Sequence, residues 1–497
     1  MLVPASAPPA PPAPFAPLAS LAPRRRRARI GLGLGLAALL GPSCGRPPPG
    51  DAPLILMISL DTTRADALGC TAAADAVGVA PRLAGLAGEG VCFSRAWSSS
   101  STTLAAHATV MTGLDSHGHG VVRNGAPVSP GVERLAERLG AAGWHSAAAV
   151  GSYALQRGMG LEQGFAAYED HGGWRGLFGL YEVSADQVTD SALALLDARP
   201  ASTPTLLFAH YYDVHMPWNS APDELQARFV PAGNPLRGDR EGVGFLTRET
   251  KAGRLRPEDR AAARGLYLAE LAWVDQQVGR LLDGLAARGL DDDLLVIVFA
   301  DHGETFDEEP ARPWGHGPDV DEPIIHVPLI IAGRGAFALP AGAPAVDGEQ
   351  ARLADLGTTA LRLALGPGAP LGGGVDLSAP WRGEALARPP SFAEATKPIE
   401  RTRDDAWPNL PLERAVVSEG LLLTRAPYLG TPDALFEAAP GQAPVVDQPE
   451  RAAALGALLT AWDAAAPGPK AVELNEETRS ALEALGYLDP AAPGAAP

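Results

Sequence analysis

Cysteine is scarce in this sequence of 497 residues, which contains only Cys44, Cys70 and Cys92. Their spacing fits neither a cysteine metal site nor a disulfide framework, so we expect no disulfide framework. Basic residues are also outnumbered, with 58 acidic against 40 basic residues and a net charge of −18. Such an acidic chain is a poor binder of nucleic acid, and any anionic substrate must be held by local groups rather than by the overall field.

An apolar run long enough to span a bilayer comfortably is missing from the N-terminal region, where the run at 30–41 is too short. It follows the basic segment 24–29, an order that is typical of a secretion signal. The small residue before Cys44 and the Pro- and Gly-rich linker after it resemble a bacterial lipoprotein cleavage site, although Pro42 departs from that pattern. We predict that 1–50 is a disordered leader, signal peptide and linker. The alternatives are an N-terminal membrane anchor or a misplaced start within a disordered leader.

These features predict an exported protein, either periplasmic or anchored to the membrane of a bacterial envelope by a lipid on Cys44. The oligomeric state cannot be read from the sequence.

From residue 53 onward, strand and helix patterns alternate. Continuous apolar runs are expected for strands that are buried on both faces of a sheet. The helix expected at 257–287 has apolar residues spaced by 4, 3, 4, 3 and 4, and Gly289 suits its end. This alternation predicts an α/β sheet covered by helices. The other expected elements are strands at 54–60, 145–150, 205–209 and 294–300, and helices at 131–142 and 186–198.

After about residue 335 the chain becomes richer in Gly and Pro between short elements. We therefore predict a catalytic core at 51–335 and a smaller α+β C-terminal subdomain with a tail at 336–497. Residues 414–425 suit a hairpin, and a last helix is expected at 476–485.

Polar side chains follow three of the predicted strands. Asp61 follows the first, residues 210–215 (His-Tyr-Tyr-Asp-Val-His) follow the second, and Asp301 and His302 follow the third. Ligands of parallel sheets bind at the carboxyl ends of strands, so these side chains are expected to converge on one divalent cation. Each Asp taken alone suits a helix cap equally well.

A hydroxyl-rich loop that opens a helix lies at 98–113. Because a helix N-terminus carries free N–H groups and a positive dipole end, it suits a bound oxyanion. A hydroxyl in this loop that touches the cation is a candidate nucleophile. The simpler alternative is a cluster of helix-capping hydroxyls.

Several of these segments resemble the sulfatase family of the alkaline phosphatase superfamily. Residues 58–66 (Ile-Ser-Leu-Asp-Thr-Thr-Arg-Ala-Asp) look like its opening motif, and 300–304 (Ala-Asp-His-Gly-Glu) look like its second metal motif. The resemblance implies a three-layer α/β/α core with a smaller α+β subdomain, and a metal-dependent enzyme acting on sulfate or phosphate esters. Further matches in the same order are 213–218 (Asp-Val-His-Met-Pro-Trp), 327–330 and 482–488.

One departure from the family concerns the nucleophile. Sulfatases carry Cys-x-Pro-x-Arg, whose Cys is oxidised to formylglycine. Aligned on the segment 112–113, this chain has Thr103 at the Cys position, Ala105 at Pro and His107 at Arg. Formylglycine therefore cannot form. The chain resembles the superfamily's Thr-dependent phosphodiesterases and its phosphoglycerol and phosphoethanolamine transferases, which implies that Thr103 attacks phosphorus or sulfur and forms a covalent ester.

The resemblance also implies a single-cation site formed by Asp61, Thr103, Asp301 and His302. An imidazole ligand favours Mn²⁺ or Zn²⁺ over Ca²⁺, which prefers oxygen ligands, but the metal's identity stays open.

Two histidines near this set are given catalytic roles. His215 is predicted to protonate the leaving oxygen, since its reference pKa lies near neutrality. The alternative is a structural His after a strand. His107 lies one helical turn past Thr103 and is predicted to contact the anion in place of the family's Arg. Packing beneath the loop is the alternative.

Three further residues are predicted to serve substrate binding. His316 resembles a family His that contacts the anion, or would contact a second metal. Arg64 either orients the metal shell or anion, or makes a structural salt bridge. Asn124 is predicted to line the substrate cleft. His117 and His119 are expected in a solvated loop, although that loop resembles a family element, and 307–309 is expected to be a solvated acidic loop.

Three functions remain open. The first is a hydrolase or transferase of phosphate esters or diesters that uses Thr103. The second is a sulfate-ester hydrolase that works without formylglycine. The third is a non-catalytic protein that kept the fold and the anion site.

Overall fold

The computed structural model describes residues 52–68, 70, 78–171, 183–308, 314–396, 413–427, 431–439, 441 and 444–466. The leader at 1–50, with its proposed signal and lipid site, and the predicted helix at 476–485 lie outside these residues.

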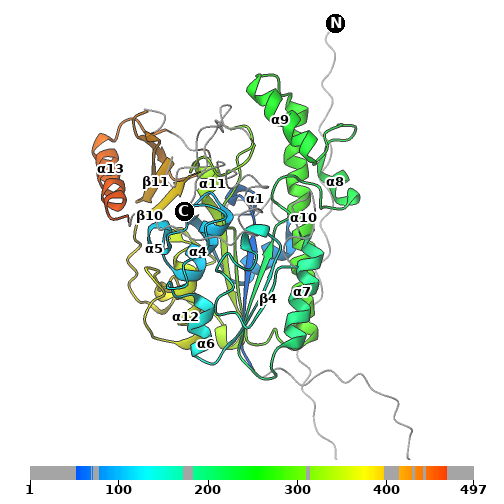
Figure 1. Cartoon of the computed structure of the whole chain (residues 1–497), viewed down its shortest axis with the longest axis vertical. Helices are drawn as coiled ribbons and strands as arrows, with labels where there is room; N and C mark the ends of the chain where they lie inside the picture. Colours follow the sequence, from blue (N-terminus) through cyan, green and yellow to red (C-terminus); the bar gives the residue numbers. More distant parts are fainter. Residues whose placement is uncertain are drawn as a thin grey trace, which may run out of the picture. The chain divides into compact units, whose positions relative to one another are not determined.

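A mostly parallel sheet forms the centre of the described chain (Figure 1). Its strands are β1 Leu54–Leu60, β2 Val91–Trp97, β3 His145–Val150, β4 Ala167–Glu169, β5 Thr205–Tyr211, β6 Leu294–Phe299, β7 His326–Gly333, β8 Val346–Asp347 and β9 Ala351–Arg352. Their order is β4-β3-β5-β1-β6-β7-β2-β8, with β9 paired to β2. Strand β7 runs antiparallel to both of its neighbours, β6 and β2.

Helices cover both faces of this sheet. The described α-helices of the chain are α1 Ala65–Leu68, α3 Pro81–Glu89, α4 Thr103–Thr112, α5 Ser116–His119, α6 Leu135–Ala141, α7 Ala185–Ala198, α8 Asp223–Phe229, α9 Arg240–Lys251, α10 Pro257–Ala287, α11 Glu322–Ile325, α12 Asp355–Leu365 and α13 Pro449–Ala464.

The side chains of β1 alternate between two apolar cores. Ile55 and Met57 belong to the core shared with α4, α6 and α12. Leu56 and Ile58 belong to the core shared with α3, α7 and α10. Because successive residues of a strand face opposite sides of the sheet, an uninterrupted apolar strand needs a helical layer on each side. The predicted three-layer α/β/α core is therefore confirmed.

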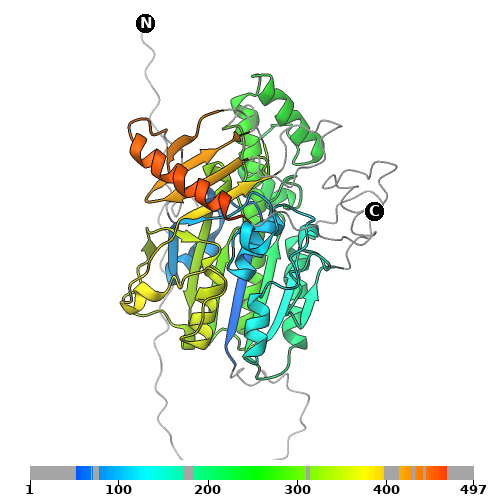
Figure 2. The ribbon, with the colours of Figure 1, turned by 60° about the vertical axis from the view of Figure 1, so that its left-hand side comes forward.

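A second, antiparallel sheet lies in the C-terminal part. Its strands, in spatial order, are β10 Ser391–Ala395, β11 Glu413–Ser418, β12 Leu421–Arg425 and β13 Ala434–Glu437. One face packs against Trp97 and α11, and the other packs against α13, which lies across the sheet (Figure 2). The predicted hairpin at 414–425 is present as β11 and β12.

The central sheet continues past residue 335, because β8 and β9 pair with β2 and α12 packs in the same core as α4. The predicted bounds of α10 agree with the structure, and Gly289 follows it with φ +66. Strand β5 runs two residues further than expected and includes His210. The helix expected at 131–142 is shorter, from Leu135 to Ala141.

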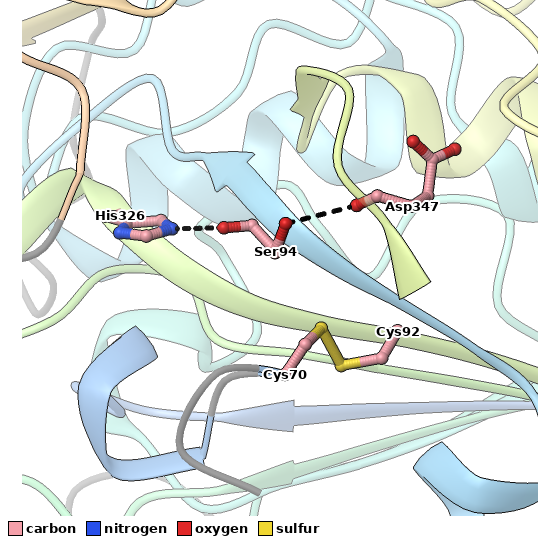
Figure 3. Close-up of a disulfide and its surroundings, with 5 residues drawn as sticks. All are labelled: Cys70, Cys92, Ser94, His326 and Asp347. Carbon is pink, nitrogen blue, oxygen red and sulfur yellow. Dashed lines mark hydrogen bonds between the residues drawn. A yellow bond between two sulfur atoms is a disulfide. The ribbon is translucent and has the colours of Figure 1, made fainter. Parts of the chain in front are cut away.

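Cys70 and Cys92 form a disulfide, which the expectation of no disulfide framework did not foresee (Figure 3). The bond links the segment after α1 to β2, with Cα atoms 5.7 Å apart across a separation of 22 residues. Two cysteines at this spacing carry no motif, and only the return of the chain beside β2 brings them together. Among the described helices, none is both long and apolar enough for a membrane crossing.

Candidate active site and metal centre

Three neighbouring strands end at the candidate site. Strand β1 lies between β5 and β6, and its Ser59 pairs with His210 on one side and with Phe299 on the other. This register brings Asp61 and Asp301 to the carboxyl edge of adjacent strands. The structure therefore shows the convergence of strand ends that the sequence predicts.

Asp61, Asp301 and His302 form a buried group in which one ligand atom from each residue lies within 4.8 Å of the others. Across the described chain, neither carboxylate oxygen of Asp61 has a hydrogen-bond partner, nor does Oδ2 of Asp301. Burial raises the pKa of Asp61 to about 7, and burial together with the charge of Asp61 raises the pKa of Asp301. Buried carboxylates without partners are costly, so this donor set fits a divalent cation.

The orientation of Asp301 is fixed by backbone donors. Its Oδ1 accepts hydrogen bonds from the N–H groups of His302 at 2.8 Å and Thr62 at 3.2 Å. Thr62 adopts φ +50, in the left-handed region that non-glycine residues rarely occupy. Oδ2 is left 3.5 Å from Nε2 of His302. The backbone thus holds one carboxylate oxygen and leaves the other for the cation.

Thr103 is the first residue of α4 and is placed beside this group. Its Oγ1 lies 3.5 Å from Nε2 of His302. The preceding loop is fixed by its own hydroxyls, for example by Ser101, which donates to the carbonyl of Gly317 at 3.0 Å. The geometry fits the predicted nucleophile, whose role stays a prediction.

Asn124 supports the same helix end. Its Oδ1 accepts the N–H of Leu104 at 2.8 Å, which satisfies a donor in the first turn of α4. Asn124 therefore helps to position Thr103, and substrate contact by its amide stays a prediction.

His107 lies between α4 and the sheet, close to the rings of Phe208 and Phe299. Its Nδ1 faces the carbonyl oxygen of Thr103 at 2.7 Å, so this nitrogen carries the hydrogen. Its Nε2 then accepts from the hydroxyl of Ser59 at 2.8 Å. Burial lowers the pKa of His107 to about 3, which keeps it neutral. These contacts match packing beneath the loop, the alternative to contact with the anion.

His210 belongs to the segment 210–215 that was expected to approach the cation, but the sequence analysis gave it no role of its own. It is fully buried near the end of β5, and its Nε2 lies 3.3 Å from Oδ2 of Asp61. Burial lowers its pKa to about 4. The sequence signal was a polar residue inside an otherwise apolar strand, directly before the motif that holds His215.

His215 and His316 face each other, with their Nε2 atoms 2.9 Å apart. Nδ1 of His215 is 2.8 Å from the hydroxyl of Tyr212 and 2.5 Å from the carbonyl oxygen of Met216. Nδ1 of His316 faces the carbonyl oxygen of Ser101 at 2.9 Å. Both Nδ1 atoms face carbonyl oxygens and act as donors, so the two Nε2 atoms can hold one proton between them. The ring of His316 lies over that of His302, at 4.2 Å between centroids, so this pair borders the metal group.

Arg64 makes the salt bridges that were its structural alternative. Its guanidinium binds Asp66 through two hydrogen bonds of 2.8 Å and Glu308 through one of 2.6 Å. It also donates to the carbonyl of Glu304 at 2.9 Å, which ties the loop after β1 to the loop after β6.

Two loops are less solvated than expected. Asp307 pairs with Arg260, and Glu308 pairs with Arg64. His119 is buried and bonds Thr109 at 3.0 Å, and burial lowers its pKa to about 3. His117 stacks on Trp462 of α13 at 3.5 Å between ring centroids. The expectation was wrong for His119, which is buried, whereas Asp307 is partly buried and Glu308 is exposed.

The fold and the site define a protein with a three-layer α/β/α core and a buried carboxylate–imidazole group at the carboxyl edge of its sheet. A sequence model of the sulfatase family matches residues 53–367, and this chain belongs to the sulfatase family. No curated protein is significantly similar to it in sequence. The family is metal-dependent, which agrees with the buried group described above.

Solved structures share the fold at low sequence identity. The phosphonate monoester hydrolase of Agrobacterium radiobacter is 22% identical, with 83% of this chain and 95% of that chain covered and a TM-score of 0.61. The phosphonate monoester hydrolase of Silicibacter pomeroyi is 24% identical, with 83% and 94% covered and a TM-score of 0.62. A 2-O GAG sulfatase is 17% identical, with 86% and 96% covered and a TM-score of 0.62.

Proposed function

We propose that this chain is an exported, metal-dependent hydrolase of phosphate, phosphonate or sulfate esters that uses Thr103 as its nucleophile and prefers phosphorus esters. The observation that carries the proposal is the position of Thr103, whose Oγ1 lies 3.5 Å from His302 in the first turn of α4. Structural neighbours that hydrolyse phosphonate monoesters agree with it.

The preference for phosphorus follows from the side chain of Thr103. A formylglycine hydrate carries two oxygens on one carbon, so its ester can break down by elimination without a second attack on sulfur. Threonine carries one oxygen at that carbon, and its ester must be cleaved by attack of water on the central atom. A phosphodiester or phosphonate ester intermediate is open to this second attack.

Asp61, Asp301 and His302 would hold the cation. Their ligand atoms lie within 4.8 Å of one another, and both carboxylate oxygens of Asp61 and Oδ2 of Asp301 have no hydrogen-bond partner in the described structure. A bound divalent cation supplies Lewis-acid stabilisation of the negative charge that develops on the reacting group. The N-terminus of α4, which carries the positive end of the helix dipole, stabilises the same negative charge.

His215 is proposed to protonate the leaving oxygen. Its Nδ1 is fixed by Tyr212 and by a carbonyl oxygen, so Nε2 is the nitrogen that can exchange a proton. His316 faces that nitrogen at 2.9 Å and keeps the ring in place. Both ring nitrogens of His107 have hydrogen-bond partners between α4 and the sheet. His107 therefore positions the carbonyl of Thr103 rather than the substrate.

The reaction then has two balanced steps. Thr103, which has first lost its hydroxyl proton to solvent, attacks phosphorus as the alkoxide, the phosphorus–oxygen bond to the alcohol breaks, and His215 gives its proton to that oxygen. Water next attacks the Thr103 ester, His215 takes a proton from the water, the bond from phosphorus to Thr103 breaks, and Thr103 leaves as the alkoxide while the acid product is released.

The test uses the purified full-length chain with Mn²⁺, Zn²⁺ or Ca²⁺ and three matched substrates: an aryl sulfate, an aryl phosphate and an aryl phosphodiester or phosphonate monoester. We expect turnover of a phosphorus ester that disappears with a chelator. Turnover of the sulfate alone would overturn the preference for phosphorus. Absence of any turnover with tight binding of the anion would favour a non-catalytic protein, and transfer of the phosphoryl or sulfuryl group to an added alcohol would identify a transferase.

Export is supported by the Cys70–Cys92 disulfide, because such bonds persist in oxidising compartments. Lipidation of Cys44 is the proposed means of anchoring. Labelling cells with a fatty-acid analogue should mark the wild-type protein and not Cys44→Ser. An unlabelled wild-type protein would refute the anchor and leave the catalytic proposal untouched.

A further inference from the structure

His210 and His107 are two buried histidines with opposite surroundings. Their rings lie 4.9 Å apart at the centroids, and neither side chain is exposed to solvent. Both nitrogens of His107 are bonded, one to a carbonyl oxygen and one to a hydroxyl. Within the described part of the chain, neither nitrogen of His210 has a hydrogen-bond partner. A fully buried polar side chain without partners is rare in folded proteins and requires an explanation.

The position of His210 supplies that explanation. Its Nε2 lies 3.3 Å from Oδ2 of Asp61, whose two oxygens are likewise without partners in the described structure. His210 also shares with Asp301 a cluster whose ligand atoms lie within 4.8 Å of one another. An unpartnered imidazole is thus aimed at the same two carboxylates that His302 approaches.

A hydrogen bond alone does not account for this arrangement. A neutral imidazole can donate only one hydrogen, so His210 could satisfy at most one oxygen of the two carboxylates. A charged imidazole would be buried beside Phe208 without solvent, which is costly. A cation satisfies the ring nitrogen and both carboxylates together.

We propose that His210 is a further protein ligand of the cation held by Asp61, Asp301 and His302. The inference rests on the metal centre of the proposed function. The donor set becomes two carboxylates and two imidazoles, which favours Zn²⁺ or Mn²⁺ over Ca²⁺.

A second ion held by His107, His210 and Asp301 is the competing arrangement. His107 would need a free lone pair on Nδ1, which is 3.7 Å from Oδ2 of Asp301. That nitrogen carries a hydrogen that is directed at the carbonyl of Thr103 at 2.7 Å. His107 is therefore a poor ligand, and one ion per chain is expected.

The experiment measures the metal directly and needs no activity. The full-length chain is stripped with a chelator and reloaded with Zn²⁺. Elemental analysis then counts bound zinc, and X-ray absorption fine structure at the zinc edge counts imidazole ligands. We expect one zinc and two imidazoles in the wild type. One imidazole in the wild type would overturn the proposal, and so would two zinc ions per chain.

Variants add a second readout. His210→Ala should reduce the count to one imidazole and weaken zinc binding by at least about 100-fold, more than loss of an outer-shell partner typically costs. His107→Gln is the matched control, and it should keep both imidazoles. An unchanged count in folded His210→Ala would refute the proposal. If a variant fails to fold, the wild-type count still decides.

Failure of this inference is distinguishable from failure of the proposed function. An active enzyme with one imidazole on its zinc would refute only the role of His210. A two-imidazole centre without turnover of any ester would refute only the catalytic proposal.

Discussion

The backbone N–H of Thr62 donates to Oδ1 of Asp301 at 3.2 Å, across a separation of 239 residues. This bond ties the end of β1 to the end of β6 and leaves Oδ2 of Asp301 for the cation. The metal group is therefore held partly by backbone donors that do not depend on the charge of Asp301.

Asp301→Asn tests whether Oδ1 of Asp301 holds the backbone while Oδ2 binds the cation. The amide oxygen can keep both backbone hydrogen bonds, while the charge repulsion with Asp61 is removed. Without metal, we expect the variant to unfold at the same or a higher temperature than the wild type. With Zn²⁺ or Mn²⁺ at 100 times its Kd, the wild type should gain about 2.7 kcal/mol and the variant almost nothing. Thermal unfolding with and without a chelator measures both; equal stabilisation of the two proteins would contradict the assignment.

Replacement of Thr103 tests the nucleophile. Thr103→Ala should lower kcat by at least about 1,000-fold, because it removes the hydroxyl that lies 3.5 Å from His302. Thr103→Ser keeps the hydroxyl and is the matched control, with kcat expected within about tenfold of the wild type. Steady-state rates and trapping of labelled phosphoryl groups on the protein measure the effect. An alanine variant with wild-type kcat would show that another group attacks.

Removal of the disulfide tests its part in stability. Cys70 and Cys92 close a loop across 22 residues. Loop-closure entropy predicts a loss of about 3 kcal/mol in the double serine variant. Denaturant unfolding gives the value, and Cys44→Ser should unfold like the wild type. A double variant as stable as the wild type would mean that the surrounding packing already fixes this segment.

Asp275 provides a pH test far from the metal group. It lies on α10 and accepts the backbone N–H groups of Leu83 at 2.8 Å and Arg82 at 3.2 Å, in the first turn of α3. Burial raises its pKa to about 6. Between pH values of about 4 and 6 the folded chain binds a proton that the unfolded chain has released, so this group's contribution to stability falls as pH rises.

The comparison for that prediction is Asp275→Asn, which does not titrate. The free energy of unfolding of the wild type minus that of the variant should decrease from pH 4 to 6 and then level off. Urea unfolding at four pH values measures this difference. A flat difference would mean that the pKa of Asp275 is ordinary in the folded chain.

Local patterns were enough for much of the fold. Helix α10 begins and ends where its apolar spacing and Gly289 indicated, and β1 is buried along its whole length. The strand ends also predicted Asp61, Asp301 and His302 as site residues, because polar residues directly after apolar parallel strands lie at one edge of the sheet.

Other features had no local signal. All ten residues of α4 are buried, so helical periodicity could not show that His107 points to the sheet. Arg64 binds its near neighbour Asp66, but it also bonds Glu308, which is 244 residues away in sequence and which no local pattern indicates. The pairing of Cys70 with Cys92 likewise depends on a chain reversal that carries no spacing motif.

The sequence by itself determined the layered α/β core, the family likeness and the residues that gather at the sheet edge, because periodicity and order along the chain are local properties. Only the tertiary structure decided which histidine is satisfied and which is left facing Asp61. Hydrogen-bond satisfaction depends on neighbours brought together from distant strands and helices, and a linear pattern does not contain them.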